Sequence, residues 1–255
     1  MQRPKVPSPD PAWEAMKAAR RNLSHDQAVQ EVAFLQRQYR LQWSNRVPLS
    51  PVDLNVVLRT LTQKRIPFVL TGAHGISGWT GKPRDTQDVD ILVKPGRNHA
   101  RAVKAIRALY PQLEMRTFTG LTAFFTPGET DSVIDVACPY RADQEETLAG
   151  PVWADDRERD LRYRVPSLEA ALANKYGAML TLTRDIAARM QDAVDFTRMV
   201  QHSQDEGREP IDLEKLEALG EKVWPGGGGK EILRLVERVK AGQAIHYDVL
   251  GRRAK

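Results

Sequence analysis

The stretch "FVLTGAHGISGWTGKPRDTQDVDILV", residues 68–93, decides how this chain folds. Apolar runs at its two ends predict two short strands, and four glycines recur between them at every third residue. In the second run Asp88 and Asp90 are two residues apart, so in a strand they share one face while the intervening apolar residues occupy the other. We therefore expect a strand, a glycine turn with a short helix, and a second strand that presents paired carboxylates opposite an apolar core.

The four glycines have different expected roles. Gly72 follows the first strand and opens the turn. Gly75 and Gly78 allow a short helix to lie close to the sheet, and Gly81 ends that helix in the left-handed conformation. The segment is not a phosphate-binding P-loop, because the required spacing of glycine, lysine and Ser/Thr is absent.

A third carboxylate follows later in the chain. Asp135 lies in "SVIDVAC", residues 132–138, another apolar run that predicts a strand. A lone carboxylate is expensive to bury in such a strand without a partner. If Asp88, Asp90 and Asp135 belong to one sheet, they could hold two Mg²⁺ ions, the arrangement used for in-line attack on a phosphoryl group. For the Asp88–Asp90 pair alone, a solvated strand face stays open as the alternative.

The composition sets broader limits. The chain has 255 residues, a single cysteine and a net charge of +5. No apolar run is long enough to cross a bilayer and the N-terminus lacks an apolar signal segment, so we expect no membrane association. The lone Cys138 favours a reducing compartment, and we expect the protein in the cytoplasm. The positive charge favours a polyanionic partner such as RNA or a nucleotide, although a solvated arginine-rich surface explains it equally well.

The expected elements place the chain in the α+β class, with a small mixed or antiparallel sheet flanked by helices and then a helical C-terminal subdomain. The predicted divisions are 1–49 for an N-terminal tail and helical extension, 50–165 for the sheet domain and 166–255 for the helical subdomain. Ser50 is the expected N-cap of its helix, and "PGGGG" at 225–229 an expected flexible break. Strands are predicted at residues 66–72, 88–93, 114–120, 122–127, 132–138 and 159–167, and helices at 24–43, 50–63, 98–110, 167–182, 185–200, 212–223 and 230–242.

These motifs together resemble a known superfamily. A strand, a glycine turn and a helix, then Arg-x-Thr-x-Asp-hydrophobic-Asp at residues 84–90 and a later strand with one aspartate, resemble the polymerase-β-like nucleotidyltransferases. The stretch looks most like the bacterial minimal nucleotidyltransferases of the AbiEii type, which are toxins or toxin relatives of abortive-infection and toxin–antitoxin systems. "VPSLEAALANKYGAMLTLTRDIAARMQDAVDF", residues 165–196, is similar to the helical segment of that family. The resemblance covers roughly residues 50–200, so it implies that 50–165 is a nucleotidyltransferase catalytic domain.

The resemblance implies a role for each carboxylate and for the turn. Asp88 and Asp90 would bind two Mg²⁺ ions, or Mn²⁺, and Asp135 would complete the metal site and help to deprotonate the acceptor. Gly72 and Ala73 would meet the nucleotide phosphates through backbone amides. Family members usually have serine or a second glycine where this chain has Ala73, so a side-chain contact to the phosphate is in doubt while the backbone amide is retained.

The resemblance also implies nucleotide-binding roles further along the chain. Arg84 and Thr86 match the Arg-x-Thr of the family and would brace the metal loop. Lys175 would face the triphosphate, with Asp192 or Asp195 near it. For the lysine a solvent-facing position is the alternative, and for the aspartates a pairing with a neighbouring arginine on the same helix.

The resulting functional hypothesis is an Mg²⁺-dependent nucleotidyltransferase. It would move a nucleoside monophosphate from an NTP to an acceptor hydroxyl, on an RNA such as tRNA, a protein or a small molecule, with release of pyrophosphate. It could be the toxin of a toxin–antitoxin system with an antitoxin protein as partner, and the N-terminal helices at 13–45 could cover the site, bind the antitoxin or mediate dimerisation. The alternative is a catalytically inactive nucleotide-binding or regulatory protein on the same fold.

Overall fold

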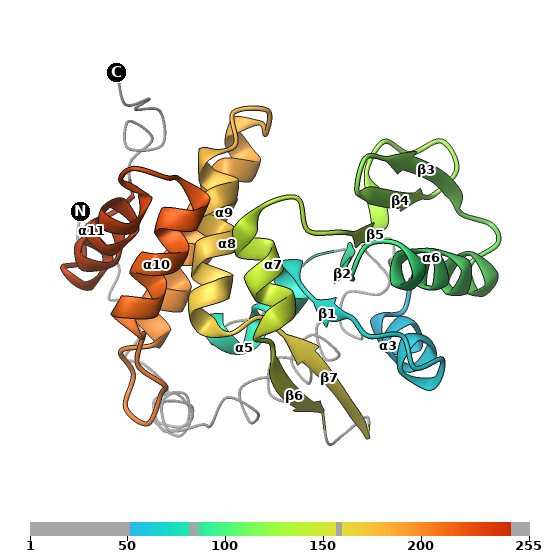
Figure 1. The fold of residues 1–255 in the computed structure, drawn as a ribbon, viewed down its shortest axis with the longest axis horizontal. Helices are drawn as coiled ribbons and strands as arrows, with labels where there is room; N and C mark the ends of the chain where they lie inside the picture. The colour runs from blue at the N-terminus through green and yellow to red at the C-terminus, as the bar shows by residue number, and fades with distance from the viewer. Residues whose placement is uncertain (1–51, 82–85, 87, 157–159, 246–255) are drawn as a thin grey trace, which may run out of the picture.

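A five-stranded mixed sheet forms one half of the protein (Figure 1). The computed structural model describes residues 52–81, 86, 88–156 and 160–245, so the predicted helix at 24–43, the predicted extension at 1–49 and Arg84 lie outside the described residues. The strand order is β1-β2-β5-β4-β3, in which β2 and β5 are parallel and the other neighbours are antiparallel. The strands are β1 (Val69–Leu70), β2 (Val89–Leu92), β3 (Glu114–Phe118), β4 (Leu121–Phe125) and β5 (Ser132–Ala137).

Two helices pack with this sheet, α3 (Leu54–Gln63) and α6 (Arg97–Leu109). Their buried faces share one core with β2, and Ile91 of β2 and Ile106 of α6 are fully buried in it. Helix α3 begins after Asp53, whose Oδ1 accepts a hydrogen bond from the Asn55 amide at 2.8 Å. The expected N-cap at Ser50, which lies outside the described residues, is therefore wrong: the helix begins later and Asp53 caps it.

One strand and one helix were not foreseen from the sequence: the strand belongs to a hairpin beside the sheet, and the helix packs against the helical half of the protein. They are β6 (Val152–Asp156), paired with the expected β7 (Leu161–Val165), and α7 (Ala142–Ala149). Strand β6 partly buries Val152 and fully buries Ala154 and Asp156, so a carboxylate interrupts its inward apolar face. Helix α7 buries only Asp143 and Thr147, both polar, so its sequence lacks the apolar periodicity that predicts a helix.

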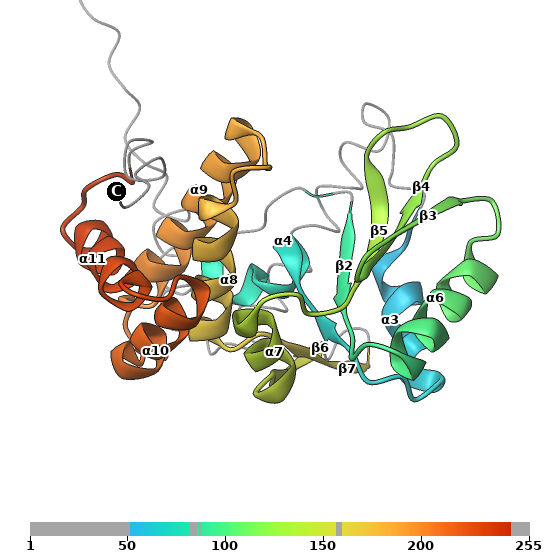
Figure 2. The ribbon, with the colours of Figure 1, turned by 45° about the horizontal axis from the view of Figure 1, so that its top comes forward.

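The other half is helical, and it is built from four helices predicted from the sequence (Figure 2). They are α8 (Leu168–Leu180), α9 (Ile186–His202), α10 (Leu213–Val223) and α11 (Gly228–Lys240). A second apolar core lies among them and contains Leu172, Phe196 and Met199. The mixed sheet with flanking helices and this helical half confirm the predicted α+β class. Val165 packs in the first core and Leu168 in the second, while the domain division at 165/166 stays a prediction.

The predicted flexible break at 225–229 is wrong in its second part. Gly228 and Gly229 form the first turn of α11 and are buried against α10. A Cβ on Gly228 would lie 2.2 Å from the carbonyl oxygen of Gly220, so these glycines allow two helices to approach closely. No helix in the described part of the chain is both long enough and apolar enough to span a membrane.

The glycine-rich segment forms two short helices, α4 (Gly72–Gly75) and α5 (Ser77–Thr80), where one was expected. A Cβ on Gly75 would lie 2.2 Å from the carbonyl oxygen of Leu70, which confirms the expected close approach to the sheet. Gly81 ends α5 with φ 61°, as expected for a glycine C-cap. Trp79 of α5 belongs to the core of the helical half, so this segment links the two halves.

Candidate functional site

The predicted carboxylates occupy neighbouring strands. Strand β2 runs parallel to β5, with Asp90 directly opposite Asp135 in the register. Residues at matched positions of adjacent strands lie roughly 5 Å apart and project from the same face. Asp88 is two residues before Asp90 and therefore belongs to this face, while Val89 and Ile91 are buried in the core on the other. The pairing of β2 with β5 thus gathers all three predicted aspartates on one face of the sheet.

The environment of Asp135 disfavours a negative charge. Burial raises the pKa of its carboxyl group above the ordinary value, and the nearby charge of Asp88 raises it further, against a hydrogen bond with Ser132 that lowers it. Within the described residues, Oδ1 of Asp135 is buried without a hydrogen-bond partner. A buried oxygen without a donor costs roughly 1–3 kcal/mol, which a bound cation would offset.

The glycine turn lies directly against Asp90. Gly72 has φ +59°, and a Cβ at this position would be 1.7 Å from Oδ2 of Asp90. The Thr71 amide donates a hydrogen bond of 2.9 Å to the carbonyl oxygen of Asp90. Ala73, the next residue of the turn, is buried in α4. Only glycine combines the left-handed backbone with this close approach, so the residue that opens the turn also makes room for the carboxylate.

The two residues predicted to brace the metal loop have different outcomes. Thr86 Oγ1 donates a hydrogen bond to Oδ1 of Asp88, which orients that carboxylate on the segment that leads into β2. Arg84, the other member of the Arg-x-Thr pattern, lies outside the described residues.

Lys175 lies in the helical half between two acidic side chains. Its Nζ is 2.9 Å from Oδ1 of Asp192 and 2.8 Å from Oδ2 of Asp195, both on α9. Arg184 adds a second cation to Asp192, with Nε 3.3 Å from Oδ2. The structure therefore brings Lys175 together with both aspartates expected near it. The lysine side chain is only 12% exposed, which excludes the solvent-facing alternative.

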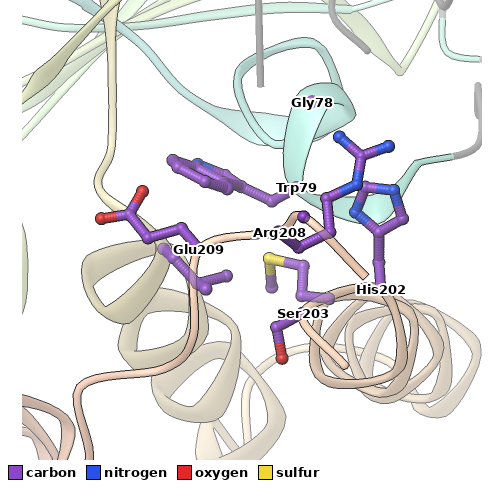
Figure 3. Close-up of a pocket in the computed structure, with 9 residues that line it drawn as sticks. Gly78, Trp79, His202, Ser203, Arg208 and Glu209 are labelled. Atoms are coloured by element: carbon purple, nitrogen blue, oxygen red, sulfur yellow. The ribbon is translucent and has the colours of Figure 1, made fainter. Parts of the chain in front are cut away.

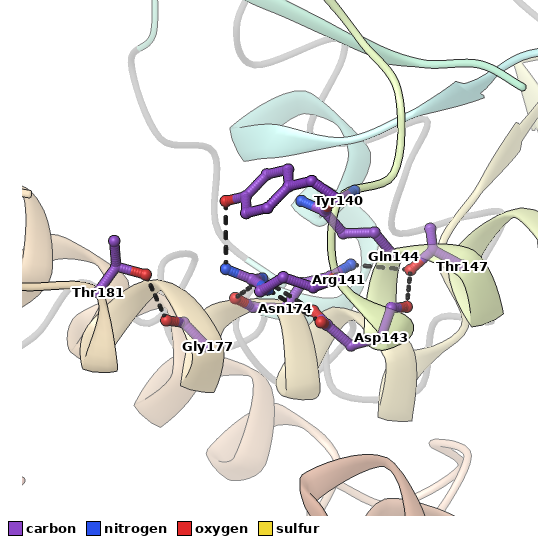
Figure 4. Close-up of polar contacts among 8 residues, drawn as sticks. All are labelled: Tyr140, Arg141, Asp143, Gln144, Thr147, Asn174, Gly177 and Thr181. Carbon is purple, nitrogen blue, oxygen red and sulfur yellow. Dashed lines mark hydrogen bonds and ion pairs between the residues drawn. The ribbon is translucent and has the colours of Figure 1, made fainter. Parts of the chain in front are cut away.

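Arg141 is a partly buried charged residue that the sequence analysis did not single out (Figure 4). It follows β5 by four residues and binds Asp143 through two contacts, Nε to Oδ1 at 2.9 Å and Nη2 to Oδ2 at 2.8 Å. A Cβ on Gly177 of α8 would lie 2.8 Å from the Arg141 Cζ, so a glycine makes space for the guanidinium. Tyr140 accepts a further bond of 3.3 Å from Nη1 at its hydroxyl. The Arg-x-Asp spacing after a predicted strand was the available signal.

A pocket of about 220 Å³ lies elsewhere, between α5 and the end of α9 (Figure 3). Trp79, Met199 and Arg208 contribute to its walls, and none of the predicted site residues lines it. Burial, followed by the charge of Arg208, lowers the pKa of His202 in this pocket to about 4, so its ring is neutral near pH 7. The pocket is thus separate from the carboxylate site.

The carboxylates fit a divalent cation in type. Carboxylate oxygens are the ligands that Mg²⁺ and Mn²⁺ prefer, and the partnerless Oδ1 of Asp135 is one such donor. In the described part of the chain, however, no three His, Cys, Asp or Glu side chains already stand close enough together to hold a metal ion. Asp88, Asp90 and Asp135 would have to turn towards one another from their shared face to do so.

Comparisons with known proteins give little further information. No protein-family model and no curated protein matches the chain. Among solved structures, the crystal structure of an antigenic nucleotidyltransferase-like protein from Paracoccidioides brasiliensis aligns with 81% of this chain and 100% of its own, at 16% identity and a TM-score of 0.45. A likeness of this degree is too weak to establish the activity of this chain.

Proposed function

We propose that this protein is an Mg²⁺-dependent nucleotidyltransferase that moves a nucleoside monophosphate from an NTP to an acceptor hydroxyl and releases pyrophosphate. The observation that carries the proposal is the parallel register that sets Asp90 opposite Asp135, with the Gly72 turn packed against Asp90. Carboxylates on one sheet face beside a glycine turn provide the two elements that such a reaction needs, namely metal ligands and backbone amides for phosphate oxygens.

The chain's own residues would divide the work as follows. Asp88, Asp90 and Asp135 would hold the metal ions, which when bound supply charge stabilisation at the phosphoryl group. Thr86 keeps Asp88 oriented through its hydrogen bond. The Gly72 turn lies against Asp90 without a side chain between them, and its backbone amides would meet the phosphate oxygens. Asp135 Oδ1, which has no donor among the described residues, would accept the proton of the attacking hydroxyl.

The finer parts of the proposal concern partners. Lys175 and Asp192 would contribute to triphosphate binding from the helical half, and Arg84 would brace the metal loop. The net charge of +5 favours RNA as acceptor over a protein. A role as a toxin restrained by an antitoxin protein in the cytoplasm follows only from the resemblance to AbiEii-type proteins.

A second candidate is a nucleotide-binding protein without catalysis on the same framework. It is favoured by one observation: the described side chains do not already converge into a three-ligand metal site. Such a protein would bind a nucleotide at the Gly72 turn but transfer nothing.

One experiment separates the two. The purified full-length chain is incubated with Mg²⁺, each labelled NTP in turn and total RNA, alongside Asp90→Asn and the control Asp131→Asn. Asp131 is exposed and lies four residues before Asp135, so its substitution removes a nearby charge without touching the site. The proposal expects label transfer by wild type and Asp131→Asn, and at least a hundredfold less by Asp90→Asn. Nucleotide binding without any transfer would favour the second candidate, and equal transfer by all three proteins would refute the role of Asp90.

A further inference from the structure

Helix α6 has an unusual distribution of charge. Its thirteen residues include four cations, Arg97, Arg101, Lys104 and Arg107, and no aspartate or glutamate. At about 100° per residue these four fall within an arc of roughly 120°. The opposite side of the helix, with Ala102 and Ile106, is buried in the sheet core. The cations therefore form a single outward stripe.

The stripe is continuous with the end of α3. Arg101 donates a 2.7 Å hydrogen bond from Nη2 to the carbonyl oxygen of Lys64, and α3 and α6 lie side by side at the end of the molecule away from the helical half (Figures 1 and 2). Lys64 and Arg65 follow directly after α3, and both side chains are exposed. We define the basic surface as these six cations: Lys64, Arg65, Arg97, Arg101, Lys104 and Arg107.

The charge of the basic surface is not balanced locally. Over the described ranges, no carboxylate forms an ion pair with any of its six members. By contrast, α11 pairs Arg234 with Glu231 at 2.8 Å and Lys240 with Glu237 at 3.0 Å. Clustered charges of one sign repel one another and attract a polyanion, whereas an ordinary solvated helix interleaves both signs.

From this surface we infer a docking site for the phosphodiester backbone of a nucleic acid. Arg97 and Arg107 are about 15 Å apart along the helix axis, with a cation every ~5 Å between them, a spacing of the same order as that of backbone phosphates. Helix α6 also has a glycine, Gly96, as its N-cap, with no side-chain cap and no acid in the first turn, so its amides add to the attraction for phosphate.

An acidic protein fits this surface less well than a nucleic acid. Protein–protein interfaces have an apolar centre inside a polar rim. Among the described residues, the large apolar side chains that are exposed include none on α6. A surface of cations without apolar anchors matches backbone contacts, which are mainly electrostatic.

The basic surface is also separate from the carboxylate site. Ile106 of α6 packs with Ile91, which lies on the sheet face opposite Asp90. The cations are therefore on the far side of α6 from the carboxylates and do not serve the triphosphate. The binding of a nucleic acid to this surface does not depend on the proposed function. Only the further step, that the bound nucleic acid is also the acceptor, rests on that function.

Binding is tested with the full-length protein and fluorescently labelled single-stranded RNA, duplex RNA and single-stranded DNA, by anisotropy over a series of salt concentrations. The test variant is Arg97→Gln/Lys104→Gln/Arg107→Gln, which leaves Arg101 and its bond to α3 in place. The control is Lys230→Gln/Arg234→Gln/Lys240→Gln on α11, three exposed cations whose removal changes the net charge by the same amount. The α6 variant should bind at least tenfold more weakly, and its slope of log affinity against log salt should fall by about 2 for a single strand. The control should change affinity less than threefold.

Three results would overturn the inference: no nucleic-acid binding by wild type, an unchanged α6 variant, or equal losses in both variants, which would reduce the effect to net charge. If the α6 variant binds RNA more weakly than wild type but binds DNA equally well, RNA is identified as the ligand. The reverse result would identify DNA. Stabilisation of the α6 variant by Mg²⁺ and NTP, measured by thermal unfolding, reports on the carboxylate site separately. A failure of the proposed function would remove that stabilisation from wild type and leave nucleic-acid binding intact.

Discussion

Replacing Gly72 with alanine should disable the carboxylate site by displacing Asp90. The new Cβ would lie 1.7 Å from Oδ2 and 2.6 Å from Cγ of Asp90, so the carboxylate must rotate away. An alanine in the left-handed region costs about 1–2 kcal/mol, and a side chain forced off its rotamer about 1 kcal/mol more. We expect a total of roughly 2–3 kcal/mol, which for a chain of this length lowers Tm by about 5–10 °C.

Gly96→Ala is the matched control for this substitution. Gly96 has φ +77°, and a Cβ there would meet no atom within 4 Å. With ψ −124° its backbone is outside the left-handed helical region, so an alanine there is strained by its backbone alone and displaces nothing. Loss of the Mg²⁺ response in Gly72→Ala but not in Gly96→Ala therefore reports the contact with Asp90.

The assay combines thermal unfolding, with and without Mg²⁺, and transfer of label from NTP. At Mg²⁺ a hundredfold above its Kd, a binding site stabilises the folded state by about 2.7 kcal/mol. Wild type and Gly96→Ala should gain this stabilisation, and Gly72→Ala should lose most of it together with transfer. If Gly72→Ala retains the Mg²⁺-dependent increase in Tm, the geometry argued for Asp90 is wrong.

Substitutions at three further sites, one of them with a control, test other contacts. The pKa of His202 is about 4 in the folded state and 6.5 in the unfolded state, so its neutral ring contributes stability that is complete above pH 6.5 and is lost as the pH drops towards 4. After screening by solvent this contribution amounts to about 2 kcal/mol. His202→Gln should remove this part of the pH dependence of Tm. Asp143→Asn should lower the free energy of unfolding by about 2 kcal/mol in denaturant titrations, because it leaves the partly buried Arg141 without its charged partner. Glu146→Gln, which breaks an exposed pair on the same helix, should cost less than about 1 kcal/mol. Trp79→Phe should lower the same free energy by about 1–2 kcal/mol through the loss of a buried 2.9 Å hydrogen bond, and an unchanged value would contradict the bond.

The parts of the fold that the sequence predicts are those with local causes. Strand β5 and helices α8 to α11 carry apolar residues at the period of their own structure, so periodicity predicts each of them. Helix α7 buries only two residues, both of them polar, and strand β6 fully buries only two, one of them an aspartate. Their positions therefore depend on tertiary contacts, which leave no local pattern in the sequence. The N-cap at Asp53 was missed because two capping residues compete within four positions, and the packing of the whole helix decides between them.

The candidate site divides in the same way. That Asp88 and Asp90 share a face follows from strand geometry alone. That Asp90 stands opposite Asp135 depends on a parallel pairing of β2 with β5, which are separated in the chain by α6, β3 and β4, and register of this kind cannot be derived from local sequence. The Arg141–Asp143 pair likewise depends on the space left by a glycine on another helix.

The energetics of the carboxylates support a role beyond folding. Asp135 is held near Asp88 with a raised pKa and an oxygen that lacks a donor among the described residues, so the folded state is less stable with this charge than without it. Gly72 leaves room for the Asp90 carboxylate beside the turn, where any other residue would displace it. The cost of the buried Asp135 carboxylate is explained if a cation binds at this site. An Asp135→Asn variant should therefore be more stable than wild type in EDTA and less stable than wild type in saturating Mg²⁺, and a variant that is less stable in both conditions would assign Asp135 to the fold alone.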